Sequence, residues 1–530
     1  MSKAIVRSTG VVGAMTLISR VTGLAREIIY ANFFGASALM DAFLVAFKVP
    51  NFLRRLFAEG AFFQGLVPVL SEYRHKRTHA EVRALVAGLA GTFGAVLLAV
   101  TLIGVIAAPV LILIFAPGFT STAGKYEQAV AMLRFTFPYL FFISLTSLFS
   151  GVLNSYGRFG VAAFTPVIMN LVMILFTAWL AADAQNPGLV LAIGVFVSGV
   201  LQLAFQLPAV ARLGLLSWPR WRPALEGVGR VARLMLPGVL GSSMAQVSLL
   251  LDSLIASFLV TGSIAWLYYA DRLMEFPLGV FSIALATVIL PGLSRHHAAE
   301  SREQFSGTLD WALRLTVLLA TPAAVGMLFF AVPLTATIFG RGAFTAQDVH
   351  MAAYALMAYS AGLLGMSLVK VLAPGYFARQ DTRTPMRISL IALSVNVALN
   401  VAVVLPAARM GFIAPHALLA ASTSISAILN TVLLWRGLRR ASVLMPSPGW
   451  LKLLTQVVLA NAAMAALLVW LAGDLDGWIA AGTWQRLGRC GFDILAAAAV
   501  YFAALLLLGL RPRDVLGRPE ARRPAPRAGD

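Results

Sequence analysis

The segment VGAMTLISRVTGLAREIIYANFFGASALMDAFLVAFKVPNFLRRLFAEGAFFQGLVPVLSEY, residues 12–73, contains two apolar runs, each long enough to cross a bilayer. Both runs carry charges. A charge at the middle of a membrane costs about 2.5–3.5 kcal/mol on insertion scales, so such residues usually face a cavity and serve a function. The segment therefore predicts a wet, cationic cavity that suits an anionic substrate. Its charged residues include Arg20, Arg26, Glu27, Asp41, Lys48, Arg54, Arg55 and Glu59.

The composition is that of a helical membrane protein. Of 530 residues, 59% are hydrophobic and only 12% are charged, whereas soluble domains have about 25% charged residues. Apolar stretches of about 20 residues recur from end to end, which predicts an all-α polytopic membrane protein with about 14 transmembrane helices. The predicted spans are 9–32, 39–66, 84–115, 128–153, 161–182, 188–211, 231–259, 264–291, 309–338, 348–374, 386–407, 413–435, 450–472 and 490–510.

Basic residues concentrate in alternate connections. The connections at 71–83, 212–230, 376–387 and 435–449 and the tail at 511–530 are rich in arginine, and the opposite connections contain few basic residues. By the positive-inside rule both termini are predicted to be cytoplasmic. The same placement attributes the net charge of +19 to membrane topology and argues against nucleic acid as a partner. The Pro- and Arg-rich tail is predicted to be disordered.

The first half of the chain is repeated in the second. Four short motifs recur in the same order at an offset of about 220 residues. Spans 1–6 and 7–12 are therefore predicted to form two pseudo-symmetric six-helix lobes around a central cavity, the layout of alternating-access transporters. The matching motifs are Pro68–Ser71 with Pro291–Ser294, Pro109–Phe115 with Pro333–Phe339, Ser144-Leu145 with Ser367-Leu368, and Thr165-Pro166 with Thr384-Pro385. The predicted domains are an N-lobe at 1–222, a C-lobe at 223–440, spans 13 and 14 at 441–510, and the tail at 511–530.

In the first span, the charged residues fall on two faces. Arg20 and Glu27 are seven residues apart and share nearly the same helical face, while Arg26 points about 120° away. Arg26 and Glu27 could instead lie near the membrane surface, where long side chains snorkel to water. Arg20 lies about halfway along the span and has no easy route to water.

The second span contains Pro50, which removes a backbone donor and predicts an interrupted, kinked helix. A broken helix with arginines at membrane depth is tolerated where it lines water. Because a proline disturbs the helical register, the spacing does not decide whether Arg54 or Arg55 faces the cavity. An ion-pair network within the lobe, such as Lys48 with Glu59 or Asp41, is an alternative.

The eighth span carries a second charged cluster in YYADRLMEFPLG, residues 268–279. Arg272 and Glu275 are three residues apart, so they can pair or jointly contact a ligand. The pseudo-symmetry places span eight opposite span two, and Arg54 and Arg272 are therefore predicted to meet across one cavity. Guanidinium groups form bidentate, charge-assisted hydrogen bonds with phosphates, which favours a phosphate-bearing substrate.

A third set of polar residues suggests a site for a coupling ion. Asp252 lies in span seven without an adjacent basic residue, Asn396 and Asn400 share one face of span eleven, and Thr423 lies in span twelve. Carboxylate, amide and hydroxyl oxygens can bind Na⁺, and a carboxylate can bind H⁺. Interhelical hydrogen bonds, worth about 0.6 kcal/mol on average, are an equal alternative.

The sequence contains no phosphate-binding Gly-Lys loop, no nucleophile elbow and no HExxH motif. The single cysteine, Cys490, excludes an internal disulfide framework and a cysteine-based metal cluster. The chain is therefore predicted to be a transporter and not an enzyme, with no resident cofactor.

The motifs SRVTGLARE, MDAFLVAFKVPNFLRRLFAEGAFFQGLVPVLSEY and YYADRLMEFPLGV resemble those of the MurJ (MviN) family of lipid II flippases. This family belongs to the multidrug/oligosaccharidyl-lipid/polysaccharide exporter superfamily. The resemblance covers essentially the whole chain. It implies fourteen helices around a V-shaped cavity, with a lipid groove formed by the last two spans. The essential charged positions of the family fall on Arg20, Arg26, Asp41, Arg54, Arg272 and Glu275, and the arginines are expected to hold the substrate's diphosphate and headgroup.

The resemblance also implies a location and partners. Lipid II, an undecaprenyl-diphosphate carrying a disaccharide-pentapeptide, would cross the bacterial inner membrane for peptidoglycan synthesis, in contact with membrane lipids and cell-wall synthesis proteins. Asp252 falls where some members have an acidic sodium ligand. Those members have an aspartate four residues after an asparagine in span eleven, where this chain has Asn396 and Asn400, so the resemblance leaves Na⁺ coupling open. The alternatives are a flippase for another lipid-linked glycan, a cation-coupled multidrug exporter and a membrane scaffold.

Overall fold

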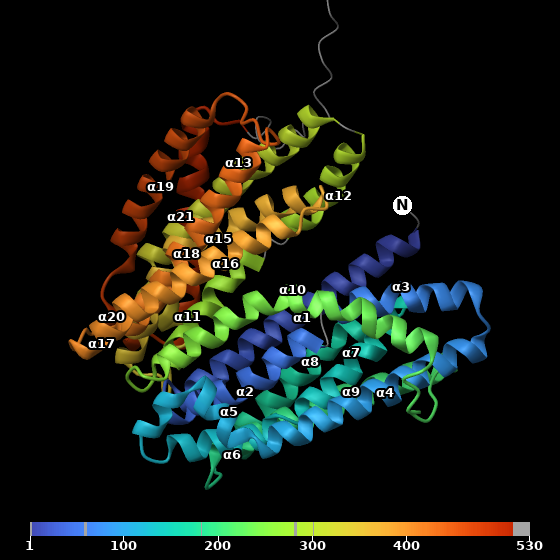
Figure 1. Ribbon diagram of the computed structural model, residues 1–530. Coiled ribbons are helices and arrows are strands. Elements are labelled where there is room, and N and C mark those ends of the chain that lie inside the picture. The colour runs from blue at the N-terminus through green and yellow to red at the C-terminus, as the bar shows by residue number, and fades with distance from the viewer. Residues whose placement is uncertain (1–2, 58–60, 182, 280–283, 300, 512–530) are drawn as a thin grey trace, which may run out of the picture. The chain divides into compact units, whose positions relative to one another are not determined.

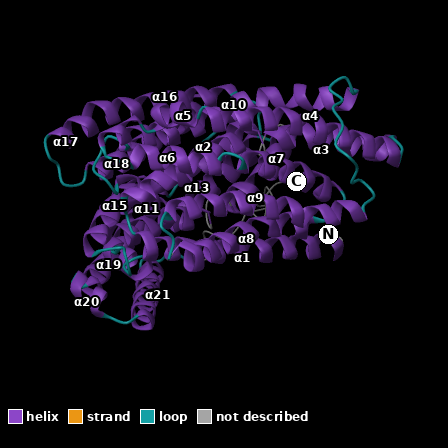
Figure 2. Ribbon diagram, turned by 90° about the horizontal axis from the view of Figure 1, so that it is seen from below, coloured by secondary structure: helices purple, strands orange, loops and turns teal. Residues whose placement is uncertain are grey.

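The computed structural model describes residues 3–57, 61–181, 183–279, 284–299 and 301–511. Over these ranges the chain is helical and contains no β-strand (Figures 1 and 2). Ten of the described helical segments are long and apolar enough to cross a membrane. The other four predicted spans correspond to α1, to α2 with α3, to α10, and to α11 with α12. The predicted all-α membrane fold is confirmed.

The chain forms two compact units, Met1–Ala265 and Trp266–Asp530. The first unit contains α1 (Lys3–Phe34), α2 (Ala38–Phe57), α3 (Ala61–Lys76), α4 (His79–Ile106), α5 (Ala108–Phe115), η1 (Pro117–Ser121), α6 (Lys125–Thr136), α7 (Tyr139–Ser155), α8 (Phe159–Leu175), η2 (Phe176–Ala181), α9 (Pro187–Arg212) and α10 (Glu226–Ala256). Helix α11 (Ser263–Pro277) begins in the first unit and continues into the second.

The second unit also contains spans 13 and 14, which form the hairpin of α19 and α21 with the short α20 at its end (Figure 2). Its remaining helices are α12 (Ala284–Ala298), α13 (Arg302–Phe329), α14 (Ala331–Ile338), α15 (Ala346–Phe377), α16 (Arg383–Leu399), η4 (Asn400–Val404), α17 (Leu405–Arg409), α18 (Pro415–Arg440), α19 (Trp450–Ala472), α20 (Leu475–Ala480) and α21 (Thr483–Leu507).

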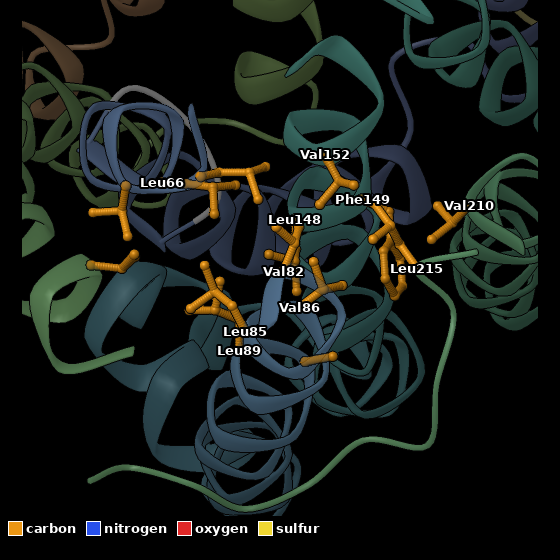
Figure 3. Close-up of a cluster of buried hydrophobic side chains, with 14 of the residues drawn as sticks. Leu66, Val82, Leu85, Val86, Leu89, Leu148, Phe149, Val152, Val210 and Leu215 are labelled. Atoms are coloured by element: carbon orange, nitrogen blue, oxygen red, sulfur yellow. The ribbon is translucent and has the colours of Figure 1, made fainter. Parts of the chain in front are cut away.

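The core of the first unit lies where α3, α4 and α7 meet (Figure 3). Leu66 on α3, Leu85 on α4 and Val152 on α7 are completely buried there. Helix α10 packs closely on α3, because a Cβ added at Gly65 would lie only 2.8 Å from the carbonyl oxygen of Val231. A small residue at this point lets the two backbones approach, as is common between membrane helices.

In the second unit, α15 and α18 pack in the same way. A Cβ added at Gly362 would lie 2.5 Å from Ser424. Two hydroxyl groups of α18 hydrogen-bond across the contact: Ser424 donates to the carbonyl of Ala358 and Thr431 donates to that of Gly365, both at 2.7 Å. Small residues and hydroxyl groups therefore let these helices approach closely, and Leu372 of α15 and Leu434 of α18 belong to one buried apolar cluster.

The internal repeat is visible in the order of the helices. In the first unit the long α4 is followed, after Ala107 alone, by the eight-residue α5; in the second, α13 is followed, after Phe330 alone, by the eight-residue α14. The π-helical segments η2 and η4 occupy equivalent places, directly after α8 and α16. The single-residue breaks divide the predicted spans 84–115 and 309–338.

Pro50 lies inside α2, which the structure describes as one helix from Ala38 to Phe57. The expected interruption at Pro50 is therefore wrong. A proline cannot donate to the carbonyl four residues earlier, which here belongs to Ala46. The buried hydroxyl of Thr136 on α6 donates to that carbonyl at 2.7 Å. This bond satisfies the acceptor, so the helix continues through the proline.

Arg486 stabilises the end of the C-terminal hairpin at which α20 lies. It is 7% exposed, and its guanidinium donates to the carbonyls of Gly340 at 2.7 Å and Ala481 at 2.8 Å, and also to that of Ile479. These carbonyls belong to segments that follow α14 and accompany α20, where a helix end leaves acceptors without partners. Arg486 therefore helps to join spans 13 and 14 to the rest of the second unit, as does Tyr501 of α21, whose hydroxyl donates to the carbonyl of Leu318 on α13 at 2.8 Å.

Candidate functional site

Arg26 on α1 is held by two neighbours in the first unit. Its Nη1 donates to Oδ1 of Asn170 on α8 at 3.0 Å, and its Nη2 pairs with Glu27. Asn170 in turn donates to the carbonyl of Ser19 at 3.0 Å and to Oγ1 of Thr22 at 3.1 Å. Asn170 therefore orients Arg26 and attaches α8 to α1, a role that no feature of the sequence indicated.

Glu27 and Arg20 differ in exposure although they share a helical face. Glu27 is 3% exposed and lies against Arg26, whose side chain is 14% exposed. Arg20, two turns earlier, is exposed. The Arg26–Glu27 pair is therefore inside the first unit, whereas Arg20 projects from it.

Asp41 is part of a buried network at one end of the first unit. Its side chain is 1% exposed and forms a 2.8 Å ion pair with Lys125 at the start of α6, itself 5% exposed. The carboxylate also accepts the backbone N–H groups of Gly262 at 2.8 Å and Ala265 at 3.0 Å. These N–H groups belong to the start of α11, where the helix dipole favours a negative charge.

Asp41 thus connects α2, α6 and the start of α11 through one carboxylate. Lys125 lies in one of the connections that contain few basic residues, and its pairing with Asp41 was not predicted from the sequence. The signal was present: a lysine flanked by apolar segments needs a counter-charge if it is buried. Sequence spacing could not identify the partner, because the two residues lie on different helices.

The other charged residues of α2 contact nearby polar groups. Lys48 donates to the hydroxyl of Ser253 on α10, and Nε of Arg54 donates to Oδ1 of Asn51 at 2.8 Å. Arg54 and Arg55 are both partly exposed, so burial does not rank one above the other. Glu59 lies outside the described residues.

Asp252, the predicted acidic ligand of a coupling ion, lies on α10 next to Ser253 and is partly exposed. It belongs to the first unit. The remaining predicted ligands of that ion belong to the second unit. Their common site with Asp252 stays a prediction.

Arg272 in the second unit pairs along its own helix. Its Nη1 lies 2.8 Å from Oε2 of Glu275, and its Nη2 lies 3.7 Å from Oδ2 of Asp271. The guanidinium also lies 5.0 Å from the ring centroid of Tyr268. The pair remains open to solvent, with exposures of 33% for Arg272 and 47% for Glu275. The predicted pairing of Arg272 with Glu275 is present, and their meeting with Arg54 stays a prediction.

Asn396, Asn400 and Thr423 come together in the second unit. Asn400 donates to Oδ1 of Asn396 at 3.2 Å, and Asn396 donates to Oγ1 of Thr423 at 3.4 Å. Both asparagines are buried, and Asn400 begins the π-helical η4. This arrangement contains the interhelical hydrogen bond that was the alternative to a cation site.

Comparison with known proteins gives a consistent result. The family model described as "Lipid II flippase MurJ" matches residues 30–481. The chain is 44% identical to a probable lipid II flippase MurJ of Vibrio cholerae, over 98% of this chain and 99% of that protein. It is 42% identical to the lipid II flippase MurJ of Burkholderia cenocepacia, over 94% of this chain and 96% of that protein.

Solved structures support the same fold. A lipid II flippase MurJ in an inward closed conformation matches with a TM-score of 0.78 at 24% identity, over 96% of this chain and 99% of that one. An inward-facing multidrug resistance transporter of the MATE family, from the MOP superfamily, matches with a TM-score of 0.65 at 13% identity, over 83% of this chain and 99% of that one. Both structures show the fold, and the sequence matches over nearly the whole chain decide between the two families. The chain belongs to the MurJ family of lipid II flippases.

Proposed function

We propose that this protein moves lipid II from the cytoplasmic to the periplasmic leaflet of the bacterial inner membrane by alternating access, and thereby supplies peptidoglycan synthesis. The observation that carries the proposal is the match to relatives named lipid II flippase over nearly the full length of both chains. Cell-wall enzymes that polymerise lipid II after it crosses are the proposed protein partners. The arginine-rich connections support cytoplasmic termini.

The arginines have the chemistry that the diphosphate requires. Guanidinium groups bind phosphate oxygens through paired, charge-assisted hydrogen bonds. Arg26 and Arg272 already contact carboxylates, Glu27 and Glu275. We expect an incoming diphosphate to exchange with Glu275, so that the Arg272 guanidinium keeps an anionic partner before and after binding. The displaced Glu275 carboxylate is 47% exposed, so water can solvate it and no isolated charge is left in a low dielectric.

Resetting the empty transporter requires an energy source. The membrane potential supplies about 2.3 kcal/mol per elementary charge per 100 mV, and the arginines carry charge on which it can act. The cluster of Asn396, Asn400 and Thr423 offers neutral amide and hydroxyl oxygens and includes no carboxylate, which fits Na⁺ poorly. We therefore expect lipid II transport to continue when Na⁺ is replaced by K⁺ and to fall when the potential is collapsed.

We propose Asp252 as the carboxylate that binds a coupling cation. Because transport is expected to continue without Na⁺, that cation would be H⁺. Asp252→Asn removes the charge at nearly constant volume. Transport by reconstituted Asp252→Asn protein, measured with and without Na⁺ and across a pH gradient, tests this role. Transport equal to wild type under every condition would exclude Asp252 from coupling.

The main test compares Arg54→Ala and Arg272→Ala with Arg409→Ala, an exposed arginine on α17. Translocation of lipid II in proteoliposomes and rescue of a flippase-depleted strain are the measurements. We expect each of the first two variants to lose at least about tenfold in rate, the effect of one lost charge-assisted interaction, and Arg409→Ala to behave as wild type. Normal transport by both Arg54→Ala and Arg272→Ala would refute the arginine site.

A second experiment tests the substrate. Binding of lipid II to the wild-type protein is measured in competition with an undecaprenyl-diphosphate that carries a different glycan. We expect lipid II to bind more tightly, because its headgroup adds contacts beyond the shared diphosphate. Tighter binding of the other glycan would reassign the protein to that substrate.

A further inference from the structure

The second unit contains a polar cavity of about 390 Å³ away from the charged residues of α11. It lies where α12 ends and α13 begins, beside the connections that follow α15 and α18. Its charged and titratable lining residues are His296, His297, Arg302 and Arg379. No carboxylate lines it among the residues that the structure describes. Its two arginines make the cavity a basic pocket.

The two arginines are available to a ligand. Among the described residues, neither guanidinium forms a hydrogen bond or a salt bridge, and Arg379 interacts electrostatically with the Asp381 carboxylate two residues further on. Arg302 is exposed and Arg379 is partly exposed. Surface arginines usually extend into water, but these two line a common hollow with a buried histidine, His296, which is 8% exposed.

The backbone around the pocket also favours an anion. Ser301 is the residue before α13, and its side chain caps none of the free N–H groups of that helix. The positive end of the helix dipole adds to the charge of the arginines, and Glu303 in the first turn of α13 offsets part of it. Phe305, one turn further on, closes the apolar side of the pocket.

The connections after α15 and α18, which line the pocket, each contain a non-glycine residue with a positive φ. In the described chain, the non-glycine residues with positive φ are Gln380, at 61°, and Ser442, at 53°. Gln380 follows the lining residue Arg379, and Ser442 separates the lining residues Ala441 and Val443. Both residues belong to helix C-terminal caps, in which a positive φ is common: the N–H of Asp381 bonds to the carbonyl of Tyr376, and the N–H of Val443 bonds to that of Leu438. The capped ends of α15 and α18 therefore form part of the pocket wall.

We propose that this pocket binds a phosphate-bearing anion, either a soluble phosphate compound or the headgroup of an anionic lipid. Two guanidinium groups, two imidazoles and a helix N-terminus match the charge and hydrogen-bonding capacity of phosphate oxygens. The pocket lies at the ends of the spans formed by α13, α15 and α18. A lipid headgroup at the membrane surface can reach such a position, and basic pockets between membrane helices bind anionic headgroups. An occupant would link three connections of the second unit.

The experiment uses the full-length protein in nanodiscs and the double variant Arg302→Gln/Arg379→Gln. The matched control is Arg436→Gln/Arg440→Gln, which removes the same charge from exposed positions near the end of α18 that do not line the pocket. In the first arm, inorganic pyrophosphate is titrated into protein in neutral phosphatidylcholine. In the second, enrichment of phosphatidylglycerol over phosphatidylcholine around the protein is measured by native mass spectrometry.

We expect the pocket variant to bind the anion at least about tenfold more weakly than wild type in one arm, and the control to bind as wild type. Loss in the first arm alone identifies a soluble phosphate ligand, and loss in the second identifies a lipid headgroup. Arg302→Lys/Arg379→Lys keeps both charges and is expected to retain binding, which separates lost charge from misfolding. Equal binding by wild type, pocket variant and control in both arms, or no binding by wild type in either, would overturn the proposal.

Discussion

Two ion pairs of equal length have different surroundings in the two units. Asp41 and Lys125 lie 2.8 Å apart with exposures of 1% and 5%. Arg272 and Glu275 also lie 2.8 Å apart, with exposures of 33% and 47%. The first carboxylate additionally accepts two backbone N–H groups. The comparison shows that a shared sequence signal, an acid in an apolar span, leads to two surroundings: Asp41 joins three helix segments in a buried network, whereas Glu275 remains open to solvent.

The largest expected effect is on the buried pair. Lys125→Ala leaves the Asp41 carboxylate without its counter-charge, and breaking a buried pair costs about 3–5 kcal/mol of stability. We expect a marked fall in the thermal unfolding midpoint of the purified protein, whereas the exposed Lys452→Ala should unfold as wild type does.

Removing both charges sharpens this prediction. Asp41→Asn/Lys125→Met keeps similar volumes and leaves no isolated charge, so it should be more stable than Lys125→Ala. If Lys125→Ala and Lys452→Ala unfold at the same temperature, the Asp41–Lys125 pair does not stabilise the fold, and the prediction that Asp41 binds substrate is favoured.

Glu275→Gln tests the exposed ion pair between Arg272 and Glu275. An exposed ion pair contributes about 0–1 kcal/mol, so the unfolding midpoint should change little. Transport should nevertheless fall by about tenfold, because the carboxylate that exchanges with the diphosphate has lost its charge. The measurements are lipid II translocation and thermal unfolding of the same preparation. A large loss of stability with normal transport by the surviving protein would reverse the two roles.

Asn170→Ala is expected to have an intermediate effect. It removes the acceptor of Nη1 of Arg26 and two bonds to α1, and a buried group that loses its partner costs about 1–3 kcal/mol. Thermal unfolding should show this loss, while Leu171→Ala, at an exposed neighbouring position, should not. Equal midpoints for the two variants would mean that Arg26 is oriented without Asn170.

The smallest expected effect concerns a residue outside the spans. The Asp381 carboxylate accepts the N–H of Thr384 at 3.0 Å, and this bond lowers the pKa of Asp381 below its ordinary value. A lowered pKa in the folded protein adds stability above the ordinary pKa, and that stability is lost as the pH falls through the folded-state pKa. Asp381→Asn should remove this small contribution to the pH dependence of the free energy of unfolding, measured by thermal unfolding at a series of acidic pH values. An unchanged dependence on pH in that range would exclude the contribution.

Hydropathy predicted the helices well because long apolar segments must form helices in a membrane. The span at 348–374 corresponds closely to α15, Ala346–Phe377. The breaks at Ala107 and Phe330 were missed because hydropathy does not change across them. The break expected at Pro50 is absent because Thr136, a residue of another helix, supplies the missing donor.

The charged site was predictable to a smaller extent. Arg272 and Glu275 could be paired because they are three residues apart on one helix. Asp41 with Lys125 and Arg26 with Asn170 could not, since these partners are distant in the sequence and meet only after the helices pack. Which charges reach substrate therefore depends on burial, a property of the folded units.

The π-helical segment η4 changes the direction of the side chains that follow it. A π-helical turn amounts to one extra residue inserted into an α-helix, and one residue corresponds to about 100° of rotation about the axis of an α-helix. Because η4 lies between α16 and α17, the side chains of α17 present a different face from the one that helical spacing counted from α16 predicts.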